Sequence, residues 1–328
     1  MQNTLAVISL KRIRENAEII KRAAGAPLIA VIKDDAYGHG AERVAHALFG
    51  IADAFAVSTV DEGAALRCAG VREDILVLTP PLDEEETIRL SYYDLIASIS
   101  SFFVLKKALA AVRTEKLTLR AHLVINTGMN RYGFLPEKLG EALKRTRELQ
   151  VEGVYSHLYL PSSETCLREQ ARLFEKSVSA VKEVYPDAVS HLAATGGILA
   201  GVKTDMARAG ISLYGYLPEG FGNALEVKPA LKVYAAVAQN GRTTGRGFGY
   251  GLNEEGAEKS HTLRFGYGDG FFRAGKLCMD ACVVKGAAKT GRRKLIFKDA
   301  AAYARLHGTT EYEALVNVTK RAEKRYDG

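Results

Sequence analysis

The sequence predicts an α/β fold: a (β/α)8 barrel of the TIM type, followed by a smaller β-rich domain. Eight short strand-like runs, most of them followed by a helical pattern, lie between residues 28 and 214, as is typical of parallel strands joined by helices. Most of the notable polar residues come at or just after the ends of these runs, where barrel strands converge on one mouth. After about residue 231, glycines become frequent and long helical patterns cease, which indicates β-rich structure.

The expected barrel strands are short and mostly apolar, as strands buried on both faces must be. They are expected at residues 28–32, 54–57, 73–78, 95–99, 117–125, 151–157, 190–194 and 209–214. Helical patterns are expected at residues 13–23, 41–49, 61–69, 103–112, 136–148 and 166–184,. A doubly wound open sheet is the alternative architecture, but no glycine-rich dinucleotide fingerprint follows the first of these strands,.

The two ends of the chain are expected to form the β-rich domain together. Further strand-like runs occur at residues 5–10, 233–238, 262–265, 282–285 and 294–297. The predicted domains are therefore residues 10–230, which form the barrel, and residues 1–9 with 231–328, which form the β-rich domain,.

Composition and charge exclude several classes of protein. Of the 328 residues, 45 are basic and 38 acidic, so the net charge of +7 is mild and spread along the chain, whereas a nucleic-acid-binding protein usually shows a concentrated basic patch. The four cysteines, Cys68, Cys166, Cys278 and Cys282, lack zinc-site spacing and are too few for a disulfide framework,. No signal pattern or bilayer-length apolar run occurs,. We expect a cytoplasmic protein with no metal, nucleic-acid partner or membrane association.

Lys33 ends the first apolar run of the predicted barrel. A long amine there must emerge at one edge of the sheet, where hydrophobic walls lower its pKa and make it a usable nucleophile or base. Gly38 and Gly40 flank His39 just beyond it and let the backbone turn tightly before the next helix,. The alternative interpretation of Lys33 is a merely solvated residue at the end of a strand.

A set of motifs resembles the alanine racemase family, in the order in which that family has them. Residues 30–40 (AVIKDDAYGHG) resemble the family's cofactor-lysine signature, and residues 126–131 (NTGMNR) its Asp-Thr-Gly-Met-x-Arg segment. Similar matches follow at residues 156–157 (SH), 191–195 (HLAAT), 208–215 (RAGISLYG), 266–270 (GYGDG), 278–280 (CMD) and 309–313. The matches cover nearly the whole chain, and together they are specific.

The resemblance implies pyridoxal 5′-phosphate as the cofactor, a homodimer as the assembly and a small amino acid as the substrate. Lys33 then carries the cofactor as a Schiff base and is one catalytic base, and Tyr267 from the second subunit is the base on the opposite face. The phosphate is held by Tyr37, Thr195, Gly210, Ile211 and Tyr312. Arg208 faces the pyridine nitrogen, His157 links Arg208 to the tyrosine, and Arg131 with the backbone of Met279 and Asp280 positions the substrate carboxylate.

The chemistry of racemisation explains these residue types. Inverting an α-carbon needs proton removal on one face and delivery on the other, which two bases on opposite sides of a planar imine provide. A tyrosine needs a cationic neighbourhood to act near neutral pH, which Arg208 acting through His157 supplies. An arginine at the ring nitrogen does not hold a proton there, which disfavours side reactions such as transamination.

Simpler structural interpretations stay open for several of these residues. Tyr267 could be an aromatic packed in a glycine-rich turn, and His157 a satisfied core histidine. Thr195 could merely cap a helix, and Met279 could be a core residue. A metal site at Cys278 and Cys282 is not expected, because their spacing is wrong and no partner histidines accompany them,.

Several departures from the family pattern bear on activity. Val124 stands where the family has a lysine, often carbamylated, that steadies the arginine, and Asn126 stands where aspartate is usual. Arg131 therefore lacks an expected anionic partner. Ala194 replaces an asparagine, and the segment between Gly270 and Cys278 is much shorter than usual. The sequence predicts a racemase, with alanine as the expected substrate. The alternatives are a cofactor-binding protein without racemase activity and a racemase of another amino acid such as serine.

Overall fold

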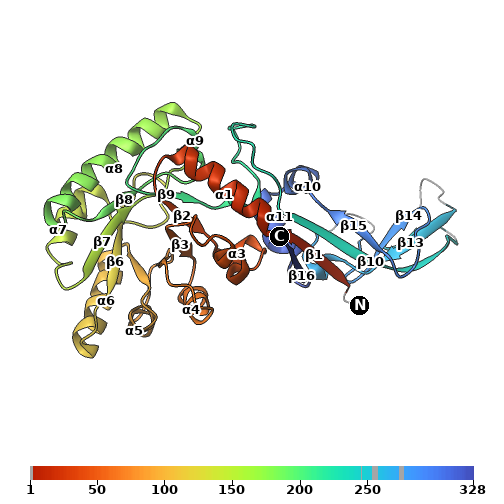
Figure 1. Ribbon diagram of the computed structural model, residues 1–328, viewed down its shortest axis with the longest axis horizontal. Helices are drawn as coiled ribbons and strands as arrows, with labels where there is room; N and C mark the ends of the chain where they lie inside the picture. The colour runs from red at the N-terminus through yellow and green to blue at the C-terminus, as the bar shows by residue number, and fades with distance from the viewer. Residues whose placement is uncertain (1–2, 245, 253–257, 273–276) are drawn as a thin grey trace. The chain divides into compact units, whose positions relative to one another are not determined.

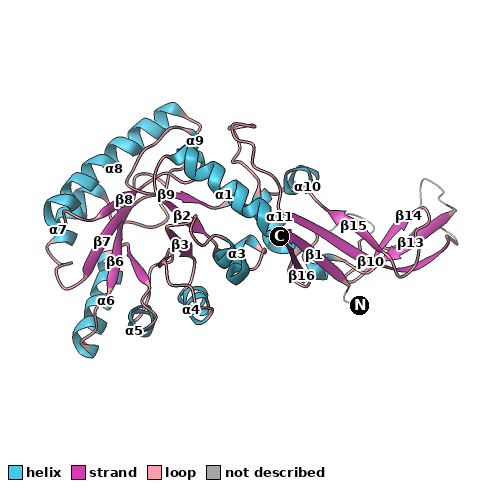
Figure 2. Ribbon diagram, viewed as in Figure 1, coloured by secondary structure: helices cyan, strands magenta, loops and turns pink. Residues whose placement is uncertain are grey.

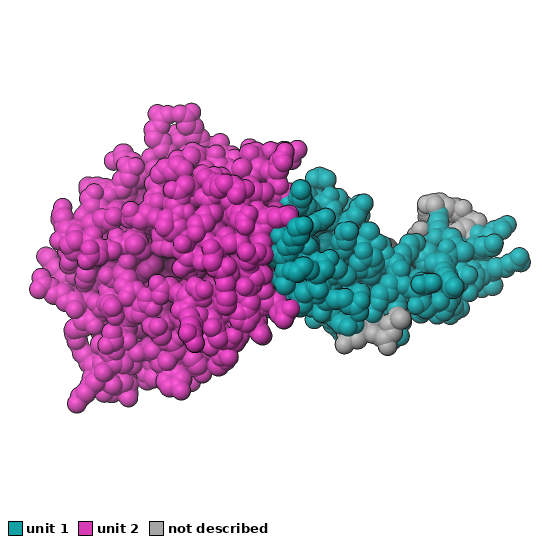
Figure 3. All heavy atoms as spheres, viewed as in Figure 1, with its two compact units in different colours: residues 1–13, 35–40, 228–328 teal, residues 14–34, 41–227 magenta. Residues whose placement is uncertain are grey.

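The computed structural model describes residues 3–244, 246–252, 258–272 and 277–328. The chain divides into two compact units, shown in Figure 3: residues 14–34 with 41–227, and residues 1–13 with 35–40 and 228–328. The first is called the barrel unit and the second the terminal unit. The domain boundaries proposed from the sequence stay a prediction.

The barrel unit contains a sheet of eight strands, whose order is β8-β7-β6-β5-β4-β3-β2-β9 and whose pairs are all parallel (Figure 1). The strands are β2 (Leu28–Val31), β3 (Ala54–Val57), β4 (Asp74–Val77), β5 (Ile96–Ile99), β6 (Arg120–Val124), β7 (Gln150–Tyr155), β8 (Val189–His191) and β9 (Ala207–Ala209). Two backbone hydrogen bonds link the segments of β8 and β9, from Met206 to Ser190 (3.1 Å) and from Arg208 to Ala193 (2.8 Å). The barrel is thus nearly closed, and the predicted fold class is confirmed.

Helices surround the barrel strands, as Figure 2 shows for α4, α5, α6 and α8. The helices that follow or precede strands are α1 (Leu10–Ala24), α3 (Ala41–Ala47), α4 (Val60–Cys68), α5 (Glu84–Tyr92), α6 (Phe102–Glu115), α7 (Leu139–Leu143), α8 (Glu164–Val184) and α9 (Thr195–Leu199). Every residue of β2, β3 and β5 is buried, which explains why these strands read as continuous apolar runs. Helix α1 is amphipathic, with Ile13, Ala17 and Ile20 fully buried,.

The helix predicted at residues 136–148 is wrong in its extent, and helix α5 was missed. Residues 136–148 form only a short 3₁₀ helix (Pro136–Lys138) and α7, because the chain leaves the helix after Leu143 and the Thr146 hydroxyl bonds to the Leu143 carbonyl at 3.1 Å. Helix α5 was not predicted. It begins at Asp83, whose side chain accepts from the Glu86 backbone, and its first turn is acidic, as the positive end of the helix dipole favours.

The terminal unit is built on a six-stranded sheet, with strand order β14-β13-β10-β1-β16 and β15 also paired to β10. Its strands are β1 (Thr4–Ser9), β10 (Leu231–Arg242), β13 (Lys259–Leu263), β14 (Cys282–Lys285), β15 (Arg293–Phe297) and β16 (Glu323–Asp327), with a separate pair β11 (Gly247–Phe248) and β12 (Gly251–Leu252). The predicted β-rich region is confirmed, although it also contains two helices that were not expected, α10 (Ala300–His307) and α11 (Glu311–Val318).

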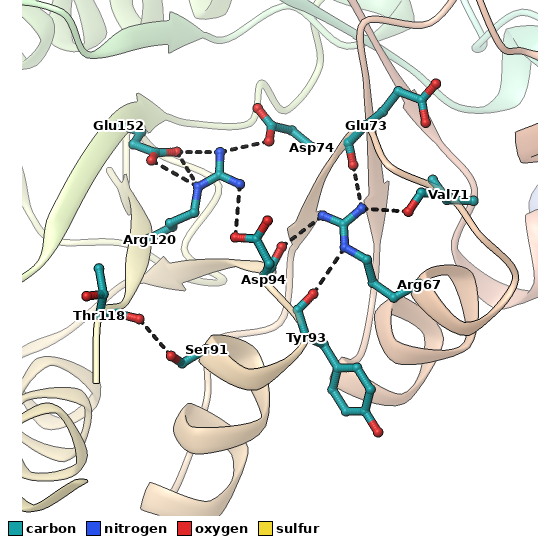
Figure 4. A network of polar contacts seen from close by, with 10 residues as sticks. All are labelled: Arg67, Val71, Glu73, Asp74, Ser91, Tyr93, Asp94, Thr118, Arg120 and Glu152. Carbon is teal, nitrogen blue, oxygen red and sulfur yellow. Dashed lines mark hydrogen bonds and ion pairs between the residues drawn. The ribbon is translucent and has the colours of Figure 1, made fainter. Parts of the chain in front are cut away.

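Two arginines tie together the amino ends of the barrel strands (Figure 4). Nη2 of Arg120 lies 2.7 Å from Oδ1 of Asp74, and Nη1 lies 3.4 Å from Oδ1 of Asp94. Its Nε donates to Oε1 of Glu152 at 2.9 Å. Arg67 instead donates to backbone carbonyls, those of Val71, Glu73, Tyr93 and Asp94. These contacts lie away from the carboxyl ends of the strands, where barrel enzymes carry their active sites, and their role is structural. No described helix is both long and apolar enough to span a membrane.

Candidate active site

Lys33 lies two residues beyond β2 and opens a short helical turn, α2 (Lys33–Tyr37). The four residues that follow it, Asp34, Asp35, Ala36 and Tyr37, all have positive φ, between 52° and 55°. This turn is therefore left-handed, which costs L residues roughly 1–2 kcal/mol each. Glu62 helps to hold its start, because its carboxylate accepts the backbone N–H of Asp34 at 2.6 Å. Such strain is typical of functional sites.

Arg208 lies in the middle of β9, not just before a strand as the sequence predicted. Residues 207–209 form β9, whereas the apolar residues after it turn into a 3₁₀ helix, Ile211–Tyr214. The side chain is buried (3% exposed). It donates to Nδ1 of His191 at 2.6 Å and to the carbonyls of His191 and Ser156 at 2.7 and 2.6 Å. Burial lowers the pKa of Arg208 to about 10, so the guanidinium is still charged at neutral pH.

His157 follows β7 and lies beside Arg208. Its Nδ1 is 3.5 Å from Nη2 of Arg208, a distance at the limit of hydrogen bonding,. Burial, with the charge of Arg208 as a further cause, lowers the pKa of His157 to about 3, so the ring is neutral under physiological conditions. The predicted proximity of His157 and Arg208 is thus present, and the role of His157 as a link is a proposal.

Thr195 and Ser212 form a pair of buried hydroxyls, 3.0 Å apart. Thr195 is the first residue of α9, and Ala194 occupies the N-cap position without a side-chain hydrogen bond. The interpretation of Thr195 as a helix cap is therefore wrong. Gly210 precedes the 3₁₀ helix that begins at Ile211 and carries Ser212, so these residues of two neighbouring segments offer hydroxyls and backbone N–H groups at the carboxyl ends of β8 and β9.

Arg131 lines a cavity of about 430 Å³ at the carboxyl ends of β4, β5 and β6. Its polar lining residues are Thr79, Ser100, Ser101, Asn126, Asn130 and Arg131. Asn126 shapes the loop, since its Oδ1 accepts the backbone N–H groups of Gly128 (3.0 Å) and Asn130 (3.1 Å). Among the described residues, no carboxylate forms an ion pair with Arg131, and Val124 is buried.

Tyr37 and Tyr312 contact each other in the terminal unit. Their ring centroids lie 6.0 Å apart, with 46° between the ring planes. Tyr37 is buried, and burial raises the pKa of Tyr312, with Glu311 adding to the effect. The phenol of Tyr312 is therefore protonated at neutral pH, as its predicted phosphate-binding role requires.

Tyr267 sits on a tight turn in the same unit, the 3₁₀ helix Tyr267–Asp269. The turn packs on the segment of Met279 and Asp280, since Tyr267 N–H donates to the Cys278 carbonyl at 3.1 Å and Gly268 N–H to the Met279 carbonyl at 2.9 Å. Tyr267 and Met279 are 39% and 53% exposed, so neither is a core residue of this chain. Tyr267 thus lies beside Met279 and Asp280, the residues whose backbone the resemblance assigns to the substrate carboxylate.

Four polar residues inside the barrel were not predicted as part of the site. His122, His191, Tyr155 and Ser98 are buried near Arg208. His191 is hydrogen-bonded to Arg208 and to His122, whereas the Tyr155 hydroxyl pairs with that of Ser98 and its ring stacks on His191. The signal in the sequence was a histidine within an otherwise apolar strand, as at His122 between Ala121 and Leu123. Such a residue must have a buried polar partner. Among the described residues no group of three or more His, Cys, Asp or Glu could hold a metal.

Comparison with known proteins identifies the family. The model of the alanine racemase N-terminal domain matches residues 8–218. The alanine racemase of Ligilactobacillus salivarius (strain UCC118) is 30% identical over 368 aligned residues, which cover 99% of this chain and 98% of the relative. That of Carboxydothermus hydrogenoformans is 32% identical, with 99% and 100% covered. The chain belongs to the alanine racemase family.

Solved structures agree with this alanine racemase assignment. The alanine racemase of Clostridium difficile 630 matches with a TM-score of 0.92 and 27% identity, covering 100% of this chain and 96% of that one. The biosynthetic alanine racemase of Pseudomonas aeruginosa matches with a TM-score of 0.84 and 27% identity. Pyridoxal 5′-phosphate is the cofactor of the family and its members are isomerases, as the sequence predicts for this chain.

Proposed function

We propose that this protein interconverts L-alanine and D-alanine, with pyridoxal 5′-phosphate at the mouth of its barrel and with Lys33 and Tyr267 as the two bases. The names of its relatives support alanine as the substrate. The observation that carries the proposal is the setting of Arg208, which is buried and whose hydrogen bonds to the described residues all go to neutral acceptors, with no carboxylate among them. A cation in this setting fits the unprotonated ring nitrogen that a racemase needs.

The donor set at the barrel mouth fits a ring that carries a phosphate. The hydroxyl of Thr195 and the backbone of Gly210 and Ile211 supply neutral donors near Ser212, and the resemblance adds the hydroxyls of Tyr37 and Tyr312. Lys33 has a side chain that is 34% exposed, which leaves its amine accessible to an aldehyde. When bound, pyridoxal phosphate supplies that aldehyde and a ring that withdraws electrons from the substrate's α-carbon.

The chain's own residues then move the proton. Lys33 takes or returns the α-proton on one face, and Tyr267 of a second copy does so on the other. The charge of Arg208, acting through the neutral ring of His157, is the cationic neighbourhood that the resemblance assigns to this phenol. Arg131 and the backbone of Met279 and Asp280 hold the substrate carboxylate, because a guanidinium and backbone N–H groups are its natural donors.

The test is exchange of the α-proton. Purified protein with pyridoxal phosphate and L-alanine in deuterated water is expected to lose the α-proton signal and to form D-alanine. Lys33→Ala abolishes both cofactor absorbance and exchange. Tyr267→Phe keeps the absorbance and slows racemisation by about 10²–10⁴-fold, whereas the control Tyr250→Phe, at a tyrosine that is 75% exposed, changes nothing. Absence of exchange in the wild-type protein would overturn the proposal.

A second candidate is a cofactor-binding protein with little or no racemase activity. The lack of an ion pair to Arg131 among the described residues and the short segment between Gly270 and Cys278 favour it. Two results together would support it. The wild-type protein shows cofactor absorbance that Lys33→Ala lacks, and the wild-type protein turns over none of a panel of amino acids. The same panel tests a racemase of another amino acid such as serine.

The proposed mechanism requires an assembly of two copies, because Tyr267 acts on the barrel of the other copy. We therefore propose a homodimer that supplies D-alanine in the cytoplasm. Sedimentation of the holoenzyme tests the dimer. Mixing Lys33→Ala with Tyr267→Phe tests the shared site, since a mixed dimer regains one complete pair of bases.

A further inference from the structure

A continuous chain of hydrogen bonds runs from Arg208 into the barrel interior. Nη1 of Arg208 lies 2.6 Å from Nδ1 of His191, and Nε2 of His191 lies 2.9 Å from Nδ1 of His122. The three side chains come from β9, β8 and β6 and are at most 4% exposed. No carboxylate takes part in these bonds, so the chain carries one charge, that of Arg208.

The direction of each hydrogen bond follows from the chemistry of the groups. A guanidinium can only donate, so Nδ1 of His191 must accept and carry no proton. Burial lowers the pKa of His122 to about 3 and that of His191 well below its ordinary value, so both rings are neutral. The neutral His191 ring therefore has its proton on Nε2 and donates to Nδ1 of His122, which in turn holds its own proton on Nε2.

We infer that His122 is a positioning residue for Arg208: its Nδ1 accepts a hydrogen bond from the protonated Nε2 of His191, which keeps Nδ1 of His191 an acceptor that faces the guanidinium. Without an acceptor at position 122, His191 is left with a buried, unpaired donor. Moving that proton to Nδ1 would place it against the donor of Arg208. The inference rests on the proposed function in one respect, namely that Arg208 meets the ring of the cofactor.

The surrounding side chains leave the two histidines little room to rearrange. The ring of Tyr155 stacks on His191, with centroids 4.8 Å apart and planes 9° from parallel, and the guanidinium carbon of Arg208 lies 5.3 Å from the same Tyr155 ring. On β7, a Cβ atom at Gly153 would lie 2.6 Å from Nε2 of His122. The His122 ring thus occupies space that only a glycine at position 153 leaves free. Gly153 on one side and the hydrogen bond to His191 on the other fix the position of this ring.

The first experiment measures the tautomers directly in the full-length protein. Histidine ring nitrogens are labelled with ¹⁵N, and ring correlations are recorded for the holoenzyme and for the protein after removal of cofactor. His122 and His191 are both expected as neutral rings protonated at Nε2, with signals assigned by their loss in variants. A proton on Nδ1 of His191, or a charged ring at either position, would overturn the inference.

The second experiment compares variants at position 122. His122→Leu removes the acceptor and is expected to weaken pyridoxal phosphate binding about tenfold and to shift the absorbance maximum of the bound cofactor. His122→Asn places an amide oxygen near the position of Nδ1 and is expected to restore most of both signals. Gly153→Ala, which displaces the ring from the other side, is expected to resemble His122→Leu.

The control is Leu123→Val, at the next buried residue of β6, which is expected to leave cofactor affinity and absorbance unchanged. Wild-type affinity and absorbance in His122→Leu would overturn the positioning role. If His122→Leu fails to fold, His122→Asn and Gly153→Ala decide the question. If the wild-type protein binds no pyridoxal phosphate, the proposed function fails, whereas the ring signals of the unloaded protein still report whether the hydrogen-bonded chain exists.

Discussion

The carboxylate of Glu62 accepts the backbone N–H of Asp34 at 2.6 Å, directly after Lys33. The same carboxylate accepts the N–H groups of Ser58 (2.6 Å) and Thr59 (3.1 Å), and Thr59 with Glu62 forms the capping box of α4. One side chain therefore joins the start of a helix to the left-handed turn that carries Lys33.

Replacing Glu62 should loosen this turn. Glu62→Ala is expected to lower the free energy of unfolding by about 1–2 kcal/mol, since it removes the Glu62 half of the capping box and the hydrogen bonds that its carboxylate accepts,. It should also slow the incorporation of pyridoxal phosphate at Lys33. The measurements are urea unfolding and the rate at which cofactor absorbance appears. Asp83→Ala is the control, because it removes the cap of α5 without touching Lys33. Equal uptake rates in the two variants would show that Glu62 acts only as a cap.

Gly266 should be required for the position of Tyr267. A Cβ atom at Gly266 would lie 2.2 Å from the backbone carbonyl oxygens of both Cys278 and Met279, so Gly266→Ala must push the two segments apart. Racemisation is expected to fall on the order of a hundredfold, as for a misplaced catalytic group, while cofactor absorbance is retained. Gly241→Ala is the control, since nothing lies within 4 Å of a Cβ there. Unchanged kcat in Gly266→Ala would argue against Tyr267 as a base.

The barrel could be predicted from the sequence because its strands are buried on both faces. Residues 28–31 and 54–57 are therefore apolar throughout and end at polar or turn-forming residues,. Helix α5 escaped prediction because three glutamates open it and its apolar face is narrow. Residues 136–148 were predicted as one helix from local pattern alone, which does not report where tertiary contacts end the helix.

The site could be predicted only in part, and for physical reasons. The residues of the motifs lie at or near strand ends, as with Lys33 and His157. The pairing of His122 with His191 depends on the register of strands 69 residues apart, which spacing in the sequence does not give. The left-handed turn at residues 34–37 contains no glycine, so the residue types in it do not predict positive φ angles there.

Stability should fall as the pH is lowered from about 6.5 toward 5. Burial lowers the pKa of His39 to about 4 and those of His122 and His157 to about 3, whereas an unfolded histidine titrates near 6.5. Below pH 6.5 these histidines are therefore protonated in the unfolded chain but stay neutral in the folded chain. The free energy of unfolding then decreases by up to about 1.4 kcal/mol per pH unit for each such histidine.

Urea midpoints at pH 7.5, 6.5, 5.8 and 5.0 measure this effect, in a range above the titration of most carboxylates. His122→Asn is expected to show a shallower dependence, since one of the buried histidines is absent. A free energy of unfolding that stays constant from pH 7.5 to 5.0 would contradict the assignment of these rings as buried and neutral.

Arg120 should matter more to stability than other arginines with ion pairs. Burial opposes its charge, but hydrogen bonds to Glu152 and Asp74 raise its pKa overall, and its side chain is only 20% exposed. Arg120→Met leaves those carboxylates without a shared cation at the amino ends of β4, β6 and β7 (Figure 4). The free energy of unfolding is expected to fall by about 1–3 kcal/mol. The loss should be smaller in 1 M NaCl, where salt screens the repulsion between the carboxylates that Arg120 no longer neutralises.

The control is Arg113→Met. Arg113 makes two hydrogen bonds to Glu148, but both side chains are exposed, so this ion pair should contribute nothing measurable to stability. Equal urea midpoints for Arg120→Met and the wild-type protein would mean that the strand ends hold together without this arginine.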